Sequence, residues 1–371
     1  MRGGGRHSHV FYVVIVMNNK KVFEQKYSNI ISLENLLLAW KEFVVGKKSR
    51  EDVREFERNL MTNIISLHED LRDKKYVHSP YQAFNISDPK PRSIHKARVR
   101  DRLLHHALYR ILYPFFDKTF ISDSYSCRVN KGTHKAIETF RKFEYQVSCN
   151  HTKTVWVLKC DIKKFFASID HNVLLKILFE YIPDEDIRGL LQKIVGSFHS
   201  THAGVGLPLG NLTSQLLVNI YMNKFDQFAK HKLKAKHYIR YADDFVFMSQ
   251  DKKWLEEVLV KVGEFLGAEL KLTLHPNKVS VSTVASGVDF LGWVHFNDHR
   301  VIRNATKKRM FRNIAEKQGK EATVQSYLGM LRHGNAGRLS KEVTETSGHC
   351  EVFRSNPRPN VPSGTGGQTF S

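Results

Sequence analysis

The sequence predicts an α+β fold in which helices back an antiparallel sheet. Two short apolar runs, residues 154–161 and 237–248, have the length and the β-branched and aromatic content of buried strands. The second run reads as a strand, a tight turn and another strand. Longer segments, such as residues 28–75, repeat apolar residues at the period of a helix. With 371 residues, the chain is long enough for two or three packed subdomains.

A strong excess of positive charge characterises the whole chain. Lysine and arginine number 58 against 37 aspartates and glutamates, a formal net charge of +21. Such an excess is typical of proteins that bind a polyanion, most often nucleic acid, although a solvated basic surface is the simpler alternative. The four cysteines lack the paired spacing of a zinc site or a disulfide framework, so we expect a reducing cytoplasm. The longest apolar run, residues 10–17, is too short to span a bilayer and predicts a buried strand or an irregular N-terminus.

Helices dominate the first part of the chain. Apolar residues recur at helical spacing through residues 28–75. Two prolines flank Lys90 and cannot continue a helix, so residues 85–94 predict a short extended pair. We expect a further helix from about Val99 to Pro114, where the proline would end it.

Strands and helices are mixed in the central part. After the strand at residues 154–161, Asp170 is expected to cap a helix. The loop at residues 206–215 leads into a second helix, and a third is expected at about residues 254–266.

The last part of the chain begins with apolar strands and ends without a pattern. Residues 270–274 and 288–296 are expected to be strands, and the chain from Arg303 is basic and helical. Gly334 is a plausible helix C-cap. Beyond about Ser340 the composition turns to Gly, Pro, Ser and Thr, which predicts disorder.

Two acidic sites stand out in this basic chain. Asp161 ends one predicted strand, and Asp243 and Asp244 form the turn of the strand pair. Adjacent like charges repel, so a cation is expected beside them. If the strands lie side by side, the carboxylates reach one sheet edge and suit two Mg²⁺ ions, which can promote phosphoryl transfer. The alternative is that these residues only cap and turn the chain, as aspartate often does.

The sequence "YADD" at residues 241–244, between apolar strands, resembles the catalytic hairpin of reverse transcriptases. Further segments resemble this family in order along residues 80–335. They are "DPKPRSIHKARVRDR" (88–102), "SYSCRVNKGTHKA" (124–136), "KCDIKKFFASIDH" (159–171), "GLPLGNLTSQ" (206–215), "LTLHPNKV" (272–279) and "FLGW" (290–293). The resemblance implies a right-hand polymerase fold of fingers, palm and thumb, and RNA-directed DNA polymerase activity.

A subfamily resemblance rests on the fourth of these segments. Leu209 precedes Gly210 and Gln215 follows Ser214, where most reverse transcriptases have glutamine and proline. The pattern is similar to that of reverse transcriptases from diversity-generating retroelements, which are prokaryotic or phage-encoded. Such enzymes copy a template RNA with frequent errors at adenines and usually work with a small basic helical accessory protein.

The resemblance assigns roles to the acidic centre. Asp161 and Asp243 would bind two Mg²⁺ ions, with Mn²⁺ as a substitute, and the Ile162 carbonyl would complete one shell. Asp244 would support them. Lys278 would protonate the departing pyrophosphate, although it could equally be an ordinary surface lysine.

Other residues would select and hold the substrates. Phe166 would be the steric gate that rejects a ribose 2′-hydroxyl, unless it is only a core residue. Leu209 would check the nascent pair less strictly than glutamine, because it offers no hydrogen bond; it could instead merely pack. Gly210 and Gln215 would hold the incoming nucleotide and the template.

Basic residues would contact the phosphates of dNTPs and of the primer–template duplex. Lys90 and Arg92 match the fingers hairpin that contacts the triphosphate, and a solvated loop is the alternative. Arg128 would hold the template backbone or lock the fingers. The basic residues expected along the duplex are Lys307, Lys308, Arg309 and Arg312.

The resemblance also divides the chain. The predicted parts are an N-terminal helical extension (1–75), fingers (76–153), a palm with finger insertions (154–300), a thumb (301–338) and a disordered tail (339–371). Two alternatives stay open: a group II intron-type or defence-associated reverse transcriptase, and an inactive, basic RNA-binding protein. No membrane partner is expected.

Overall fold

The computed structural model describes residues 21–87 and 91–345. The strand predicted at residues 10–17, Lys90 and the tail beyond residue 345 lie outside the described residues. Within the described ranges, no helix combines the length and the apolar character needed to cross a membrane.

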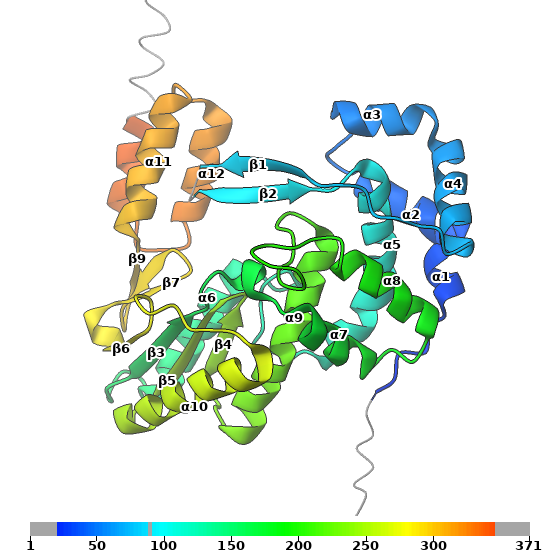
Figure 1. Ribbon diagram of the computed structural model, residues 1–371. Helices are drawn as coiled ribbons and strands as arrows, with labels where there is room; N and C mark the ends of the chain where they lie inside the picture. Colours follow the sequence, from blue (N-terminus) through cyan, green and yellow to red (C-terminus); the bar gives the residue numbers. More distant parts are fainter. Residues whose placement is uncertain (1–20, 88–90, 346–371) are drawn as a thin grey trace, which may run out of the picture.

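A four-stranded antiparallel sheet lies beside α10 at the lower left of Figure 1. The prediction of a strand ending at Asp161 and of a strand pair around a tight turn is confirmed. The strands lie in the order β4 (Tyr238–Tyr241), β5 (Asp244–Ser249), β3 (Trp156–Asp161) and β6 (Ser280–Thr283). The chain therefore places β5 beside β3 although many residues separate them.

Helices cover both faces of this sheet, because successive strand residues point to opposite sides. Leu158 and Phe247 belong to the core that includes residues of α9 and α10. Val157 and Val246 pack with Phe140 of α6 on the other side. The helices are α6 (Thr133–Val147), α9 (Leu212–Gln227) and α10 (Lys252–Leu270). The predicted α+β class, with an antiparallel sheet backed by helices, is thus confirmed.

The helical N-terminal region is confirmed but consists of four helices. They are α1 (Tyr27–Ile31), α2 (Leu33–Phe43), α3 (Glu51–Arg58) and α4 (Leu60–Arg72). They pack around α5 (Val99–Phe116), which continues through Pro114 instead of ending there. The proline lies in the last turn, where it removes only one N–H, and the buried Phe116 side chain anchors the residues after it.

The predicted extended pair is an antiparallel hairpin of β1 (Gln82–Ile86) and β2 (Arg92–Lys96). It projects away from the N-terminal helices (Figure 1). The backbone N–H of His95 donates to the carbonyl of Leu209 at 3.1 Å, and the Asn211 side chain donates to the carbonyl of His95 at 3.0 Å. These two bonds join the hairpin to the loop that precedes α9.

Shorter helical elements lie along the chain between the longer helices and the strands of the main sheet. Asp170 caps α7 as predicted, because its carboxylate accepts the N–H of Val173 at 2.9 Å. The elements are η1 (Asp117–Thr119), η2 (Phe165–Ser168), α7 (His171–Phe179), α8 (Glu185–Val195) and the π-helical turn η3 (Phe228–Lys232).

A second, three-stranded sheet and a helical unit follow the main sheet. The helices pack on a core of their own that includes Trp293, Met310 and Leu331. The elements are η4 (Val284–Ser286), β7 (Val288–Phe290), β8 (Trp293–His295), β9 (Arg300–Ile302), α11 (Asn304–Glu316) and α12 (Glu321–Leu331).

Two strand predictions need correction. Residues 270–274 do not form a strand: α10 runs to Leu270, and only Leu274 makes an isolated bridge, to Ile162. The fourth strand of the sheet is β6 instead. Residues 288–296 fold into two strands rather than one, because Leu291 and Gly292 both have positive φ and turn the chain back.

The end of the described chain also differs from the prediction. Gly334 is not a helix C-cap: α12 ends at Leu331, and a Cβ at Gly334 would lie 2.0 Å from Cζ3 of Trp293. The glycine is therefore required by close packing. The expected start of the tail at residue 339 is too early, because residues 337–345 are helical and Val343 is fully buried.

Candidate active site

The acidic residues predicted from the sequence meet at one end of the sheet. Asp161 and Asp244 are direct cross-strand partners of β3 and β5, so their Cβ atoms lie on the same face, about 5 Å apart. Asp161 is 6% exposed. Asp243 occupies the turn between β4 and β5, next to them. The expectation that tertiary structure unites these acids is therefore met.

The turn that carries Asp243 has a strained backbone. Ala242, the first of its two central residues, has φ +56°. This position of a tight hairpin turn usually holds glycine, and a left-handed alanine costs about 1 kcal/mol. Such strain at a turn is often found at functional sites.

A fully buried ion pair fixes the backbone of this turn through a hydrogen bond. The guanidinium of Arg240 donates to both carboxylate oxygens of Asp226, at 2.8 and 2.7 Å, and both side chains have no exposed area. The same guanidinium donates to the carbonyl of Ala242 at 3.2 Å and to Asn219 of α9 at 3.2 Å. Arg240 thus fixes the backbone that precedes Asp243. The sequence analysis missed it, although an arginine inside an apolar strand was a usable signal.

The carboxylates of the turn are held in an environment that disfavours their charge. Burial raises the pKa of Asp243, and the charge of Asp161 raises it further, against Lys278 and Arg92. Burial likewise raises the pKa of Asp244 to about 6, with Lys159 opposing and Asp243 and Asp161 adding to the shift. A bound cation would relieve both costs.

Lys278 lies at this centre, as predicted, but it pairs with Asp161. Its Nζ donates to the two carboxylate oxygens at 2.8 and 2.9 Å, and its side chain is 41% exposed. The segment that carries it is fixed to β3, because the N–H of His275 donates to the carbonyl of Asp161 at 2.8 Å. The ammonium provides the positive charge that the acidic centre requires.

The donor set fits a hard cation that also binds substrate. Within the described ranges, no three His, Cys, Asp or Glu side chains are arranged to hold a metal ion by themselves. Magnesium needs few protein carboxylates when phosphate oxygens and water complete its shell. Asp161, Asp243 and the adjacent carbonyl of Ile162 are therefore suitable ligands for a metal shared with a nucleotide.

Phe166 and Leu209 lie in two segments that are bonded to each other. The N–H of Leu207 donates to the carbonyl of Phe166 at 2.8 Å. The ring of Phe166 is partly buried and meets the buried Phe165 edge to face. Leu209 is also partly buried, and its carbonyl bonds to His95 of the hairpin.

Gly210 lets the hairpin and this loop approach each other. Its φ of +102° disfavours other residues, and a Cβ there would lie 3.0 Å from Cγ2 of Ile94. Gln215 follows on α9 and lines a pocket of about 390 Å³ between the hairpin, α5 and the N-terminal helices. Lys47, Arg50 and Arg102, which the sequence analysis did not select, also line it.

Two predicted basic residues have distinct surroundings. Arg128 is a structural clamp with a 6% exposed side chain: it donates to the Asp117 carboxylate at 2.7 Å and to the carbonyls of Ile121 and Ser124. This arrangement favours locking of the fingers over template contact. Arg92 lies at the start of β2 and is close enough to lower the pKa of Asp243.

The basic residues predicted for the duplex lie on α11. Lys307 pairs with Glu342 at 3.3 Å, and Arg312 pairs with Glu316 at 3.7 Å. Lys308 is exposed and Arg309 is partly buried. The positive charges of Lys307 and Arg312 are therefore partly neutralised by neighbouring carboxylates.

Comparison with known proteins agrees with this geometry. The family model described as "Reverse transcriptase (RNA-dependent DNA polymerase)" matches residues 86–295. Protein YkfC of Escherichia coli strain K12 is 27% identical over 290 residues, which cover 68% of this chain and 74% of YkfC. The group II intron-encoded protein LtrA of Lactococcus lactis subsp. cremoris is 23% identical over 314 residues, 64% of this chain and 50% of LtrA. The retron Ec83 reverse transcriptase of Escherichia coli is 26% identical over 186 residues, 47% of this chain and 59% of that protein.

Proposed function

The chain belongs to the reverse transcriptase family, and from this premise we propose that its acidic centre makes cDNA on a template RNA by two-metal nucleotidyl transfer. The observation that carries the proposal is the pairing of Asp161 with Asp244 across β3 and β5, beside Asp243 in the turn. The family acts on template RNA and dNTPs with divalent metal ions. The choice of two Mg²⁺ ions, with Mn²⁺ as a substitute, is ours.

The residues of the centre would divide the work of nucleotide addition. Asp161, Asp243 and the Ile162 carbonyl hold the ions, and Asp244 supports them from the facing strand. When bound, the ions supply Lewis acidity at the primer 3′-hydroxyl and at the departing pyrophosphate. Lys278 moves from the Asp161 carboxylate to donate a proton to the pyrophosphate.

Residues around the centre would position the dNTP. Arg92 and Lys90 bind the triphosphate through charge-assisted hydrogen bonds. The ring of Phe166 excludes a ribose 2′-hydroxyl, while Gly210 and Gln215 contact the nucleotide and the template. Lys307, Lys308, Arg309 and Arg312 follow the duplex backbone without reading bases.

The same proposal divides the chain into the parts of a right-hand polymerase. The N-terminal extension covers residues 1–75, the fingers 76–153 and the palm 154–300. The thumb begins at residue 301 and, given its third helix, extends to residue 345.

We further propose that the chain is the reverse transcriptase of a diversity-generating retroelement. The support is the sequence of residues 206–215, with Leu209 before Gly210 and Gln215 after Ser214. Errors at template adenines and a small basic helical accessory protein follow from that assignment. The alternative is an intron-type or retron-type enzyme. It is supported by the similarity of the chain to a group II intron-encoded protein and to a retron reverse transcriptase.

Primer extension tests the central proposal. The purified chain, with its accessory protein if one is encoded beside it, is given oligo(dT) on poly(rA), dTTP and Mg²⁺. We expect extension by the wild type and a loss of at least about a thousandfold in rate with Asp243→Ala, because a metal ligand is removed. The matched control is Asp251→Ala, which removes the exposed carboxylate that caps α10 beyond the far end of β5.

Two results would contradict the proposal. Absence of product from the wild type under all these conditions would favour an inactive RNA-binding protein. Equal rates for the wild type and the Asp243→Ala variant would show that the acidic centre is not the active site.

A further inference from the structure

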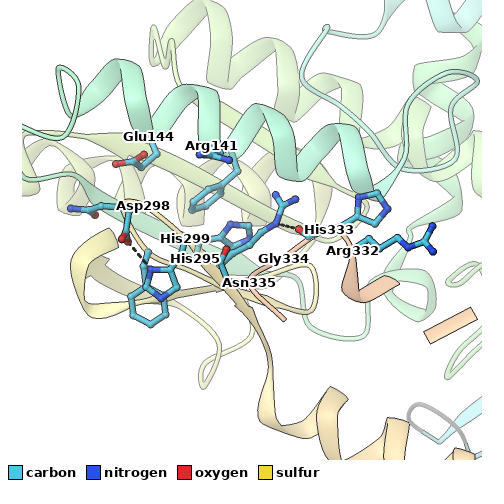
Figure 2. Close-up of a pocket in the computed structure, with 13 residues that line it drawn as sticks. Arg141, Glu144, His295, Asp298, His299, Arg332, His333, Gly334 and Asn335 are labelled. Atoms are coloured by element: carbon cyan, nitrogen blue, oxygen red, sulfur yellow. Dashed lines mark hydrogen bonds and ion pairs between the residues drawn. The ribbon is translucent and has the colours of Figure 1, made fainter. Parts of the chain in front are cut away.

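A second pocket lies at the junction of α6, the second sheet and the last helices (Figure 2). Its volume is about 280 Å³. The lining comes from α6, from the turn between β8 and β9, and from residues 332–335 after α12. None of these residues belongs to the acidic centre, so the pocket requires an explanation of its own.

Three arginines give this pocket a concentration of positive charge. Arg141, Arg300 and Arg332 line it, and none of them forms an ion pair with another described residue. Burial lowers the pKa of Arg300, and the nearby charge of Arg141 lowers it further. Glu144 and Asp298 also line the pocket, so its charge is mixed. Guanidinium groups placed together in this way can bind an anion such as phosphate through charge-assisted hydrogen bonds.

The backbone keeps Arg300 in place at the pocket wall. Its Nε donates to the carbonyl of His333, and the N–H of Asn335 donates to the Arg300 carbonyl at 2.9 Å. The guanidinium also lies 5.6 Å from the ring centre of Trp293. These contacts leave the two terminal nitrogens of Arg300 available for a ligand.

A buried carboxylate oxygen without a partner also faces this pocket. Glu144 lines it and is 2% exposed. His151 bonds to Oε1 at 3.1 Å, while Oε2 has no hydrogen-bond partner among the described residues. A buried acceptor without a donor costs about 1–3 kcal/mol. The pocket therefore calls for a hydrogen-bond donor as well as an anion.

The turn between β8 and β9 adds an aromatic surface. The rings of Phe296 and His299 stack at 4.7 Å with planes 10° apart. The His299 side chain is 36% exposed, so part of this surface is accessible. Stacked rings of this kind are common platforms for nucleobases.

We propose that this pocket binds a ribonucleotide unit, with its phosphate between Arg141 and Arg300, its 2′-hydroxyl on Glu144 and its base on the Phe296–His299 pair. A bare inorganic anion would leave Glu144 unpaired, and a deoxyribonucleotide lacks the 2′-hydroxyl and keeps a sugar donor only where its 3′-hydroxyl is free. The pocket volume suits one nucleotide rather than a duplex. The unit belongs to an RNA strand or to a free ribonucleotide; the strand as source rests on the proposed function, which supplies RNA to this protein.

Binding of short single-stranded RNA to the wild type tests the proposal directly. The polymerase cleft is first saturated with an unlabelled, chain-terminated primer–template, and fluorescence anisotropy then follows a labelled RNA or its 2′-deoxy equivalent. We expect the RNA to bind about tenfold more tightly, as one charge-assisted hydrogen bond allows. Unlabelled AMP, dAMP and RNA are then compared as competitors of the labelled RNA. If AMP competes, dAMP does not, and unlabelled RNA competes no better than AMP, the site is assigned to a free ribonucleotide. Stronger competition by the RNA assigns it to a strand.

Matched variants locate the binding. Arg141→Gln and Arg300→Gln should each weaken RNA binding about tenfold. Lys142→Gln removes the same charge from the next, exposed residue of α6 and should change affinity less than about twofold. Glu144→Gln should reduce the preference for RNA while DNA binding is kept.

Two outcomes would overturn the proposal: equal affinity of the wild type for RNA and DNA, or an equal loss of RNA binding in Lys142→Gln and Arg141→Gln. Failure here is separable from failure of the proposed function, because primer extension by the wild type reports only on the acidic centre and the binding assay involves no nucleotide addition.

Discussion

At the residue scale, the acidic centre combines carboxylates whose pKa is raised with a turn that a buried ion pair holds in place. Asp244 lies opposite Asp161 across the sheet, and burial raises its pKa to about 6. Arg240 and Asp226 compensate by holding the turn with charges that are fully satisfied within the core. Burial and neighbouring acids thus raise the pKa of Asp243 and Asp244 at the place where a cation is expected.

The raised pKa of Asp244 predicts a pH-dependent gain in stability when its charge is removed. The native pKa lies above the unfolded value, so the native state binds the proton more tightly and this group destabilises the fold above about pH 6. Without divalent ions, we expect the free energy of unfolding of Asp244→Asn to exceed that of the wild type by about 1–2 kcal/mol at about pH 8. At about pH 3 or below, where Asp244 is protonated in both states, the gain should disappear. Urea unfolding at both pH values measures it; a gain that is the same at both would show that the effect is not electrostatic.

Leu209 predicts a change in fidelity. Replacement by glutamine adds hydrogen-bonding groups beside the nascent pair, so a wrong substrate leaves more polar atoms unpaired. We expect Leu209→Gln to lower misincorporation opposite template adenine severalfold, as counted by sequencing the cDNA. Leu209→Met keeps the apolar character and should retain the wild-type error frequency. An unchanged adenine error frequency in Leu209→Gln would show that the leucine only packs.

At the element scale, most of the main sheet and the acidic centre follow from the sequence. The nearly continuous burial of β3 and β5 reflects the apolar runs that a strand between two helical layers requires, and the paired acids lie at the ends of these strands. Recognition of the ordered motifs supplied what local patterns do not: that β3 and β5 are neighbours.

The failures have local physical causes. Residues 270–274 have a strand-like composition, but Leu270 is the last residue of α10, and of the others only Leu274 forms a β-bridge, to Ile162. Residues 288–296 conceal a turn, because leucine rarely takes the positive φ that Leu291 adopts. Arg240 and the pocket around Glu144 depend on contacts between distant segments, which one sequence does not reveal.

Gly334 predicts a packing effect at the junction of the second sheet with the last helices. A Cβ there would collide with the buried Trp293 ring, whose shift would disturb the surrounding core. We expect Gly334→Ala to lower the free energy of unfolding by about 1–3 kcal/mol. Gly329→Ala is the control: its Cβ meets no atom within 4 Å and it lies inside α12, so it should be neutral or stabilising by up to about 1 kcal/mol. Chemical unfolding compares them, and equal stability of both variants would refute the close-packing role.

At the scale of the whole molecule, a net charge of +21 accompanies an acidic centre at one end of the main sheet. Part of this charge is neutralised locally, as at Lys307 and Arg312. The remainder would attract a polyanion, while Asp161, Asp243 and Asp244 together form a charge pattern that suits a cation. The two patterns are complementary in an enzyme that must hold nucleic acid and metal together.

Salt dependence of duplex binding is the corresponding prediction. Each lysine that contacts a phosphate contributes about one unit to the slope of log K against log salt. We expect Lys308→Gln to reduce the slope for a primer–template by about one. Lys253→Gln removes an exposed charge from α10, behind the main sheet, and should leave the slope unchanged. Identical slopes for wild type and Lys308→Gln would place Lys308 away from the duplex.

The link between the β1–β2 hairpin and the loop before α9 limits how the two can move. Because His95 gives its N–H to Leu209 and its carbonyl to Asn211, the hairpin cannot swing without either carrying that loop along or breaking both bonds. In the proposed function, the hairpin contacts the triphosphate and the loop contacts the nascent pair, so the backbone of His95 would couple these two contacts.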